Sequence, residues 1–205
     1  MKEIIKDKST GISIRKGDII VNVELCDENA SIPEYANSFE RDGVKIPMDF
    51  GLDIKAVSVE YDEKMDCYIY HTGLKFNMPE DVVMLLFPRS SNRKTDAYLA
   101  NSVGIVDWSF NKEVLVCFKN RTSLEDRKMR IEHDIIKNSI LNKDGLTEIR
   151  KRLKQVKEIN PMDYAPYEVG NKIAQLAVLK YDATVINQVD FVKDGGRGCF
   201  GSTGN

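Results

Sequence analysis

The chain carries its most informative stretch near its middle, in Leu99-Ala100-Asn101-Ser102-Val103-Gly104-Ile105-Val106-Asp107. The β-branched pair Ile105-Val106 follows a glycine, which is typical of a strand that begins at a turn. Asp107 places a carboxylate directly after these two strand residues. Taken by itself, an aspartate at the end of a strand forms a turn more often than it acts in catalysis. The surrounding sequence therefore has to decide between these two interpretations.

Segments typical of short strands lie on both sides of this stretch. They are rich in β-branched or aromatic residues and are bounded by Gly, Pro, Asn or Asp. We predict strands at residues 19–25, 54–59, 68–70, 82–87, 114–118, 172–179 and 184–186. No helical periodicity separates the first five, which favours an all-β sandwich or barrel over an α/β fold.

Residues 123–160 interrupt this β pattern. Apolar residues there recur at three- and four-residue steps, the helical period, on either side of the segment 142–145 (Asn-Lys-Asp-Gly). We predict two amphipathic helices joined by a tight turn, and Asn160-Pro161 ends the insertion because the residue before a proline disfavours helix. From Arg121 to Glu158 eleven Lys/Arg outnumber seven Asp/Glu, so this segment carries +4 and the remainder −6.

The C-terminus is rich in glycine, with five in the eleven residues from Gly195 to Asn205. Such a segment forms no stable element alone, because each glycine loses the most backbone entropy on ordering. It is either a floppy tail, the commoner case, or a loop that orders over a ligand. In the second case the side chains that contact the ligand would be those of Arg197, Phe200, Ser202 and Thr203.

The composition excludes several classes of protein. A chain of 205 residues with 42% hydrophobic and 30% charged residues can build a real core and is not disordered. Its longest apolar run, Val82 to Phe87, is far shorter than the ~20 residues of a membrane-spanning helix, and no signal peptide is visible. A net charge of −2 gives no argument for nucleic-acid binding, and four scattered cysteines favour reduced thiols over a zinc site. We expect a soluble, cytoplasmic protein that binds neither membranes nor nucleic acid.

Polar clusters bracketed by glycine follow several of the predicted strands. They lie at residues 49–56, 87–91, 101–107 and 170–176, and the glycine-rich tail comes last. In the second cluster, Arg89-Ser90-Ser91 sets a guanidinium beside two hydroxyls, a combination that suits phosphate oxygens. Alone, such a triplet is more often an exposed turn. No G-x-S-x-G elbow and no P-loop are present, so the sequence indicates no covalent nucleophile.

In this order the five segments resemble the five signature motifs of the homotrimeric deoxyuridine triphosphate nucleotidohydrolases (dUTPases). The resemblance spans residues 49–204, about three quarters of the chain, and its most specific pieces are residues 99–107 and the Phe-Gly-Ser-Thr-Gly segment 200–204. It implies hydrolysis of dUTP to dUMP and pyrophosphate, which keeps uracil out of DNA. No covalent intermediate is needed for this reaction.

The same resemblance implies an architecture. Residues 1–205 would form a single domain, a jelly-roll-like β barrel with the helical hairpin of residues 123–160 inserted and a flexible arm at residues 194–205. The domain would assemble as a homotrimer with shared active sites. The first, second and fourth motifs would come from one chain, the third from a second chain and the arm from a third.

The resemblance also assigns roles to individual residues. Asp107 would orient and deprotonate the water that attacks the α-phosphorus, since an ordinary carboxylate is ionised at pH 7. Mg²⁺ would be held by the phosphates and water rather than by protein ligands, which leaves Asp53 a structural or outer-shell role. The substrate contacts would be Arg89, Ser90 and Ser91 with the phosphate chain, Gln175 near the α-phosphate, Asn101, Gly104, Ile105 and Val106 with uracil, Phe110 under the deoxyribose, Phe200 stacked on uracil, and Arg197, Ser202 and Thr203 with the terminal phosphates.

The chain departs from the family pattern at several positions. Phe110 stands where tyrosine is common, which keeps the ring that discriminates against a 2′-hydroxyl. Gly195 stands where the arm arginine is usual, so Arg197 would have to reach the γ-phosphate from a shorter arm, and Cys199 replaces a glycine. The helical insertion replaces a short strand pair.

Two alternatives remain open. A dCTP deaminase shares the fold and an Arg-Ser-Ser motif, but it needs a glutamate seven residues after Phe110, where this chain has Cys117. A regulatory protein could use the basic helical pair to bind another protein, although a solvated, self-packed hairpin is the commoner case. For a viral protein, the expected location extends to the cytoplasm or nucleus of the host.

Overall fold

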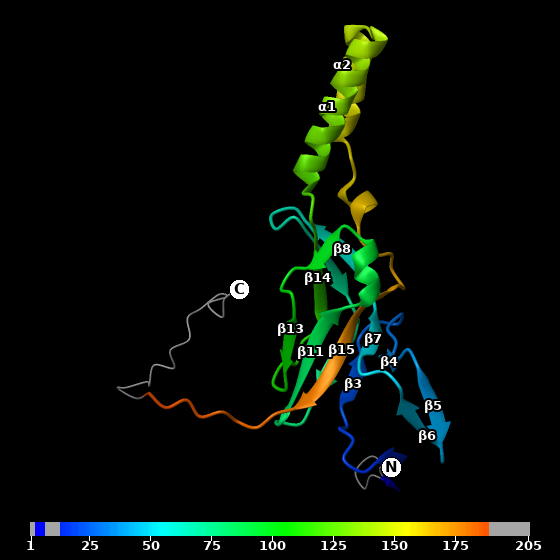
Figure 1. Ribbon diagram of the computed structural model, residues 1–205, viewed down its shortest axis with the longest axis vertical. Coiled ribbons are helices and arrows are strands. Elements are labelled where there is room, and N and C mark those ends of the chain that lie inside the picture. The colour runs from blue at the N-terminus through cyan, green and yellow to red at the C-terminus, as the bar shows by residue number, and fades with distance from the viewer. Residues whose placement is uncertain (1–2, 7–12, 189–205) are drawn as a thin grey trace, which may run out of the picture.

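The computed structural model describes residues 3–6 and 13–188 (Figure 1). Two helices form the insertion, α1 (Leu124–Asn142) and α2 (Leu146–Lys157), and two short 3-10 helices are η1 (Ser90–Lys94) and η2 (Pro161–Tyr164). The strands are β1 (Ile4–Lys6), β2 (Ser13–Arg15), β3 (Asn22–Leu25), β4 (Glu34–Tyr35), β5 (Ser38–Arg41), β6 (Val44–Pro47), β7 (Leu52–Lys55), β8 (Ser58–Asp62), β9 (Cys67–His71), β10 (Leu74–Asn77), β11 (Val82–Pro88), β12 (Ala97–Leu99), β13 (Gly104–Asp107), β14 (Leu115–Asn120) and β15 (Lys172–Lys180). The glycine-rich segment 194–205, with Arg197, Cys199, Phe200, Ser202 and Thr203, lies outside the described residues.

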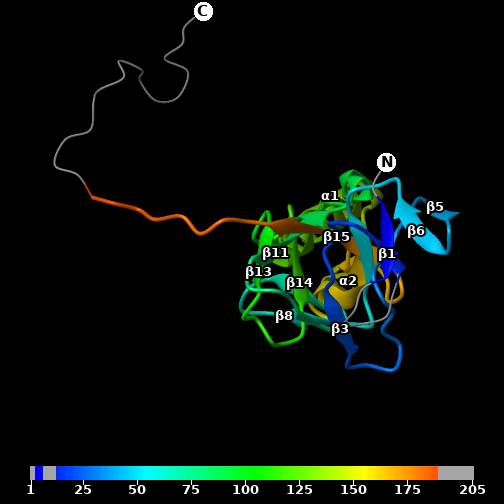
Figure 2. The same cartoon turned by 90° about the horizontal axis from the view of Figure 1, so that it is seen from below.

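The strands form antiparallel sheets. A five-stranded sheet has the order β13-β11-β15-β7-β4, and a four-stranded sheet has the order β12-β14-β9-β8. Three further pairs are β1-β2, β10-β3 and β5-β6. Figure 2 shows the β5-β6 hairpin projecting on the side opposite to residues 181–188, which lead away from β15. The fold is therefore mostly β with one helical hairpin, as the sequence predicts.

The two larger sheets share one hydrophobic core. Tyr70 and Phe118 of the four-stranded sheet are fully buried in the same cluster as Ile54, Met84 and Leu176 of the five-stranded sheet. Every second residue of β11 points into this core, as the period of two requires. In β15 the alternation is broken by a bulge near Lys172, where the register with β7 shifts. The bulge matters for the site because it lies beside the polar residues described below.

The predicted strand at 54–59 divides at Ala56. There the chain leaves one sheet for the other, because the N–H of Ala56 donates to the carbonyl of Asn171 while the N–H of Val57 donates to that of His71. The predicted strand at 19–25 is shorter than expected and begins at Asn22. The predicted strand at 184–186 is wrong. Val185 and Ile186 are 90% and 91% exposed and have no regular structure, since β-branched residues form a strand only where another strand offers hydrogen bonds.

The helical insertion has the predicted form. Figure 1 shows α1 and α2 side by side, as a stalk that leaves the β sheets at one end of the molecule. The Ser123 side chain caps α1 by accepting from the N–H of Asp126 at 3.0 Å, and Lys143 ends it with a φ of 56°. At the tip of the hairpin, the apolar side chains of Ile140, Leu141 and Leu146 are exposed. That the insertion binds another protein stays a prediction. Neither these helices nor the other helical segments within the described ranges are long and apolar enough to cross a membrane.

Candidate functional site

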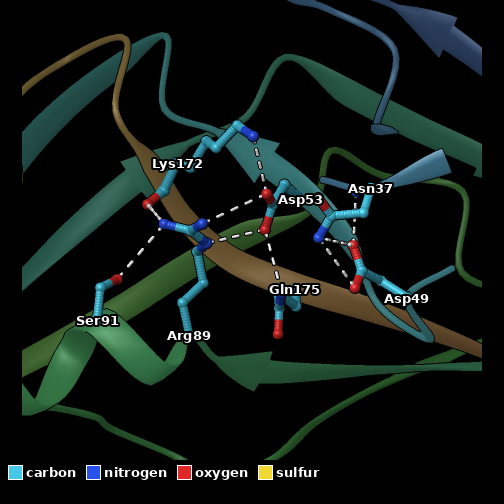
Figure 3. Close-up of polar contacts among 7 residues, drawn as sticks. All are labelled: Asn37, Asp49, Asp53, Arg89, Ser91, Lys172 and Gln175. Atoms are coloured by element: carbon cyan, nitrogen blue, oxygen red, sulfur yellow. Dashed lines mark hydrogen bonds and ion pairs between the residues drawn. The ribbon is translucent and has the colours of Figure 1, made fainter. Parts of the chain in front are cut away.

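The central feature of the site is Asp53, a carboxylate that is only 4% exposed. Arg89 Nε donates to its Oδ1 at 2.8 Å, Lys172 Nζ lies 2.9 Å from its Oδ2, and Gln175 Nε2 donates to Oδ1 at 3.2 Å. Figure 3 shows Arg89, Lys172 and Gln175 converging on this side chain. The buried charge is therefore compensated by two cations and an amide, as a carboxylate inside a protein requires.

The sheet order explains why these residues meet. Gln175 on β15 pairs with Asp53 on one side and with Phe87 of β11 on the other. Arg89 follows the last residue of β11, two positions after the Phe87 that pairs with Gln175. Its side chain reaches the same carboxylate of Asp53 as that of Gln175. Three of the clusters predicted from sequence, at residues 49–56, 87–91 and 170–176, thus meet at one end of β11 and β15.

The partners of Asp53 control its ionisation. Burial by itself would raise the pKa of this carboxyl, but the hydrogen bonds from Lys172, Arg89 and Gln175 and the charge of Arg89 outweigh burial and lower the pKa below its usual 3.8. Asp53 therefore stays ionised and holds the Arg89 and Gln175 side chains in place. This arrangement fits the structural role predicted for Asp53.

We expect Asp53→Asn to lower the free energy of unfolding at pH 7 by about 2 kcal/mol, because the amide leaves two cations without their partner. A carboxyl whose pKa is lowered by folding stabilises the folded protein at pH values above its usual pKa of 3.8. This stabilisation is lost as the pH falls through the lower pKa of the folded state. The difference between wild type and variant should therefore shrink below about pH 4. Urea unfolding of both proteins at several pH values measures this difference in the free energy of unfolding.

The exposed Asp81, which pairs with Lys180 at 3.1 Å, provides the matched control for this prediction. Asp81→Asn should cost less than about 0.5 kcal/mol, because exposed ion pairs contribute little. A loss for Asp53→Asn that stayed the same from pH 7 to pH 3 would show that the carboxylate charge is not what stabilises the site.

A cavity of about 460 Å³ opens beside this cluster. Arg89, Ser90 and Gln175 line it, together with Asp49 and Phe50. Arg89 Nη1 also points to the Ser91 hydroxyl and to the carbonyl of Lys172, both at 3.4 Å, so the predicted phosphate contacts lie next to one another. The guanidinium is already bound to Asp53, however, and would share its donors between Asp53 and a phosphate.

Sequence reasoning missed three residues of this cavity region. Lys172 belongs to the fourth cluster, and its cationic side chain next to a strand was a signal that could have been used. Asp49 and Asn37 form a second pair, in which the N–H of Asn37 donates to Asp49 Oδ2 at 2.6 Å and its side-chain amide donates to the same atom at 3.0 Å (Figure 3). This pair closes the base of the β5-β6 hairpin. Nothing in the sequence around Asn37 marks it.

A second cavity, of about 160 Å³, lies at β13. Five of the six residues predicted to contact uracil and deoxyribose line it, namely Asn101, Gly104, Ile105, Val106 and Phe110, whereas the sixth, Phe200, lies outside the described residues. The other lining residues are Leu86, Leu99, Val114, Leu115 and Cys117. Glycine relieves crowding at position 104, because a Cβ there would lie 3.1 Å from the Leu86 Cβ and 3.4 Å from the Asn101 amide nitrogen, and these neighbours would have to shift. Narrowness and apolar walls make this cavity suitable for a planar base.

Asp107 lines neither of these two cavities. It is the exposed last residue of β13 and pairs with Val83 near the start of β11, whereas Arg89 follows the end of β11. Six residues at about 3.3 Å each separate these two positions by about 20 Å. Within one chain, the predicted catalytic carboxylate is therefore far from the predicted phosphate contacts.

Comparison of structures identifies similar folds. A variant of the dUTPase of Staphylococcus bacteriophage 80alpha with dUpNHpp matches with a TM-score of 0.55 and 19% identity, over 91% of this chain and 99% of the phage chain. A second variant of the same dUTPase has a TM-score of 0.56 and 19% identity, over 89% and 98% of the two chains. A variant of the dUTPase of phage phi11 of S. aureus, whose structure describes a structural Mg(II) ion, matches with a TM-score of 0.52 and 20% identity, over 84% of this chain and 97% of the phage chain.

Sequence comparison adds nothing to this result, because neither a family model nor a curated protein matches the chain. At such low identity the structural match concerns the course of the backbone, and it extends over nearly the whole length of the phage enzymes. The chain therefore has the fold of the phage dUTPases.

Proposed function

We propose that this chain hydrolyses dUTP to dUMP and pyrophosphate. The observation that carries the proposal is the small cavity at β13, because its walls include Asn101, Gly104, Ile105, Val106 and Phe110, five of the residues predicted to contact uracil and deoxyribose. A slot of about 160 Å³ beside the backbone of β13 suits the edge of a uracil ring and leaves little room for a 5-methyl group. The shared fold of the phage dUTPases supports the same conclusion.

In the proposed reaction Asp107 accepts a proton from the water that attacks the α-phosphorus. Arg89, Ser90, Ser91 and Gln175 hold the phosphate chain by hydrogen bonds and charge. Most of the rate enhancement would come from positioning and from neutralising phosphate charge, since no covalent intermediate forms. Arm residues Arg197, Phe200, Ser202 and Thr203 are proposed to close over the bound nucleotide.

Mg²⁺ fits this site as an ion bound through the substrate. Both oxygens of Asp53 already accept from cations or an amide, and the described residues contain no cluster of three or more His, Cys, Asp or Glu that could hold a metal. Phosphate oxygens and water are the ligands that Mg²⁺ prefers. When bound, the ion would neutralise charge on the triphosphate.

We further propose that the site is completed between chains of a homotrimer of jelly-roll-like barrels. The separation of about 20 Å between Asp107 and Arg89 within one chain supports this assembly, because a water activated by Asp107 would be too far from a phosphate chain held by Arg89 of the same chain. Exposed apolar side chains near the larger cavity support it as well, since Met48 and Phe50 are about 70% exposed and would be buried against a neighbour.

Pyrophosphate release from dUTP, dTTP, dCTP and UTP with magnesium tests the proposed activity. We expect release from dUTP at least about a hundredfold faster than from the other three, because the proposed base slot would reject a 5-methyl group and Phe110 under the deoxyribose would reject a 2′-hydroxyl. Release of ammonia from dCTP would instead identify a deaminase. Equal rates for dUTP and dTTP would show that the cavity at β13 does not bind the base.

A further inference from the structure

The chain returning from the helical insertion makes a direct contact with the turn that carries Ser90 and Ser91. The hydroxyl of Tyr167 donates to the side-chain oxygen of Asn92, in η1, at 2.8 Å. We propose that Tyr167 is a positioning residue, which sets the conformation of the phosphate-binding turn through Asn92. The inference rests on the proposed function, because it assigns a role in the site where the phosphates would bind.

Asn92 is well placed to control this turn. Its N–H donates to the carbonyl of Arg89 at 2.9 Å, its side-chain amide donates to the carbonyl of Ala97 at 3.0 Å, and its own carbonyl accepts from the N–H of Thr95 at 3.0 Å. The Thr95 hydroxyl also binds Asn92, since it donates to the Asn92 carbonyl at 2.8 Å and to its side-chain oxygen at 3.1 Å. Because η1 has no side-chain cap and no buried residue, the hydrogen bonds of Asn92 are important for the shape of this turn. Fixing the Asn92 side chain therefore fixes the segment from Asn92 to Ala97, which directly follows Ser91.

Tyr167 is in turn held by the core. The Tyr70 hydroxyl accepts from the N–H of Tyr167 and donates to its carbonyl, both at 2.9 Å, and the Tyr167 ring packs against Phe118 with centroids 5.1 Å apart. Burial raises the pKa of the Tyr167 hydroxyl, and the charge of Arg89 only partly opposes this effect. The hydroxyl is therefore protonated at neutral pH, as a donor to Asn92 must be.

The other limb of the insertion contacts the same segment. Arg127, in the first turns of α1, forms an ion pair with Asp96, and the N–H of Arg121 donates to the carbonyl of Asp96 at 2.7 Å. The segment from Arg89 to Ala97 is thus held by residues at both ends of the insertion. We conclude that the base of the insertion is part of the framework of the phosphate site.

Tyr167→Phe removes only the hydroxyl and keeps the ring in the core. We expect the KM for dUTP to rise about fivefold with kcat changed less than about twofold, which is the effect of losing one hydrogen bond that orders a binding group. The matched control is Tyr68→Phe, because the Tyr68 hydroxyl donates to the carbonyl of Pro161 at 2.8 Å, at the same limb but away from the turn. Tyr68→Phe should lower stability to a similar extent and leave KM unchanged.

Amide hydrogen exchange gives a second measurement that does not depend on the substrate. The amides of Asn92 and Thr95 should exchange about fivefold faster in Tyr167→Phe than in the wild type or in Tyr68→Phe. Equal exchange and equal KM in the two variants would overturn the proposal, even if the protein hydrolyses dUTP. Faster exchange in Tyr167→Phe alone would support the positioning role even if dUTP proved not to be the substrate, so the two proposals can fail separately.

Discussion

Asp107→Asn is expected to lower kcat for dUTP about a thousandfold, because an amide of the same shape cannot accept the proton of the attacking water. The affinity for a non-hydrolysable dUTP analogue should stay within about threefold, since the proposed contacts with base, sugar and phosphates do not include this carboxylate. Asp107 is exposed at the end of β13, so the substitution should not disturb folding. Pyrophosphate release and titration calorimetry measure the two effects.

The control for Asp107→Asn is again Asp81→Asn. Asp81 directly precedes β11, in which Val83 pairs with Asp107, so the two aspartates are close in the fold and both are exposed. The Asp81 variant should retain the wild-type kcat. Turnover that survived Asp107→Asn, or lost nucleotide binding with turnover remaining, would contradict the assignment of Asp107 as the base.

Mixing two inactive chains should restore activity. Asp107→Asn and Arg89→Ala each remove an essential group, but from opposite ends of β11, about 20 Å apart. If the site combines Arg89 of one chain with Asp107 of another, then in trimers formed from equal amounts of the two variants about a quarter of the sites receive both intact groups. Co-expression with two affinity tags, followed by pyrophosphate release, should recover about a quarter of the wild-type activity in the unfractionated trimers and about a third in the doubly tagged fraction, which lacks the two inactive homotrimers.

Two further mixtures make this result decisive. Wild type combined with the double variant Asp107→Asn/Arg89→Ala should give about a quarter of the activity if the site is shared, but about half if each chain builds its own site. Because Arg89→Ala leaves the buried Asp53 with one cation fewer, the double variant Ser90→Ala/Ser91→Ala serves as a second partner that keeps the contacts of Asp53. No recovery with either partner would place Asp107 and the phosphate contacts in a single chain.

Local patterns in the sequence predict the local structure well. The insertion follows from the spacing of its apolar residues, and its first helix begins after Ser123, whose side chain accepts from the N–H of Asp126. Strand propensity was less reliable, because Val185 and Ile186 have the right residues without a neighbouring strand. The break at Ala56 was also hidden, since it depends on which sheet each half of the segment joins.

The candidate site shows the same limit. The order of the motifs predicts residues that surround the cavity at β13, since the five predicted base and sugar contacts within the described part of the chain all line it. Motif order carries no information on distance, so it could not reveal that Asp107, on β13, pairs near the start of β11 whereas Arg89 follows the end of β11. It could not reveal Tyr167 either, because the partner of its hydroxyl is 75 residues away in sequence.

The stalk formed by α1 and α2 affects which methods can measure the molecular mass of the assembly. A rod projecting from a compact body raises the friction of the particle out of proportion to its mass (Figure 1). Gel filtration calibrated with spherical standards would then overestimate the number of subunits. Light scattering or sedimentation equilibrium, which report mass independently of shape, are the appropriate methods for counting the chains.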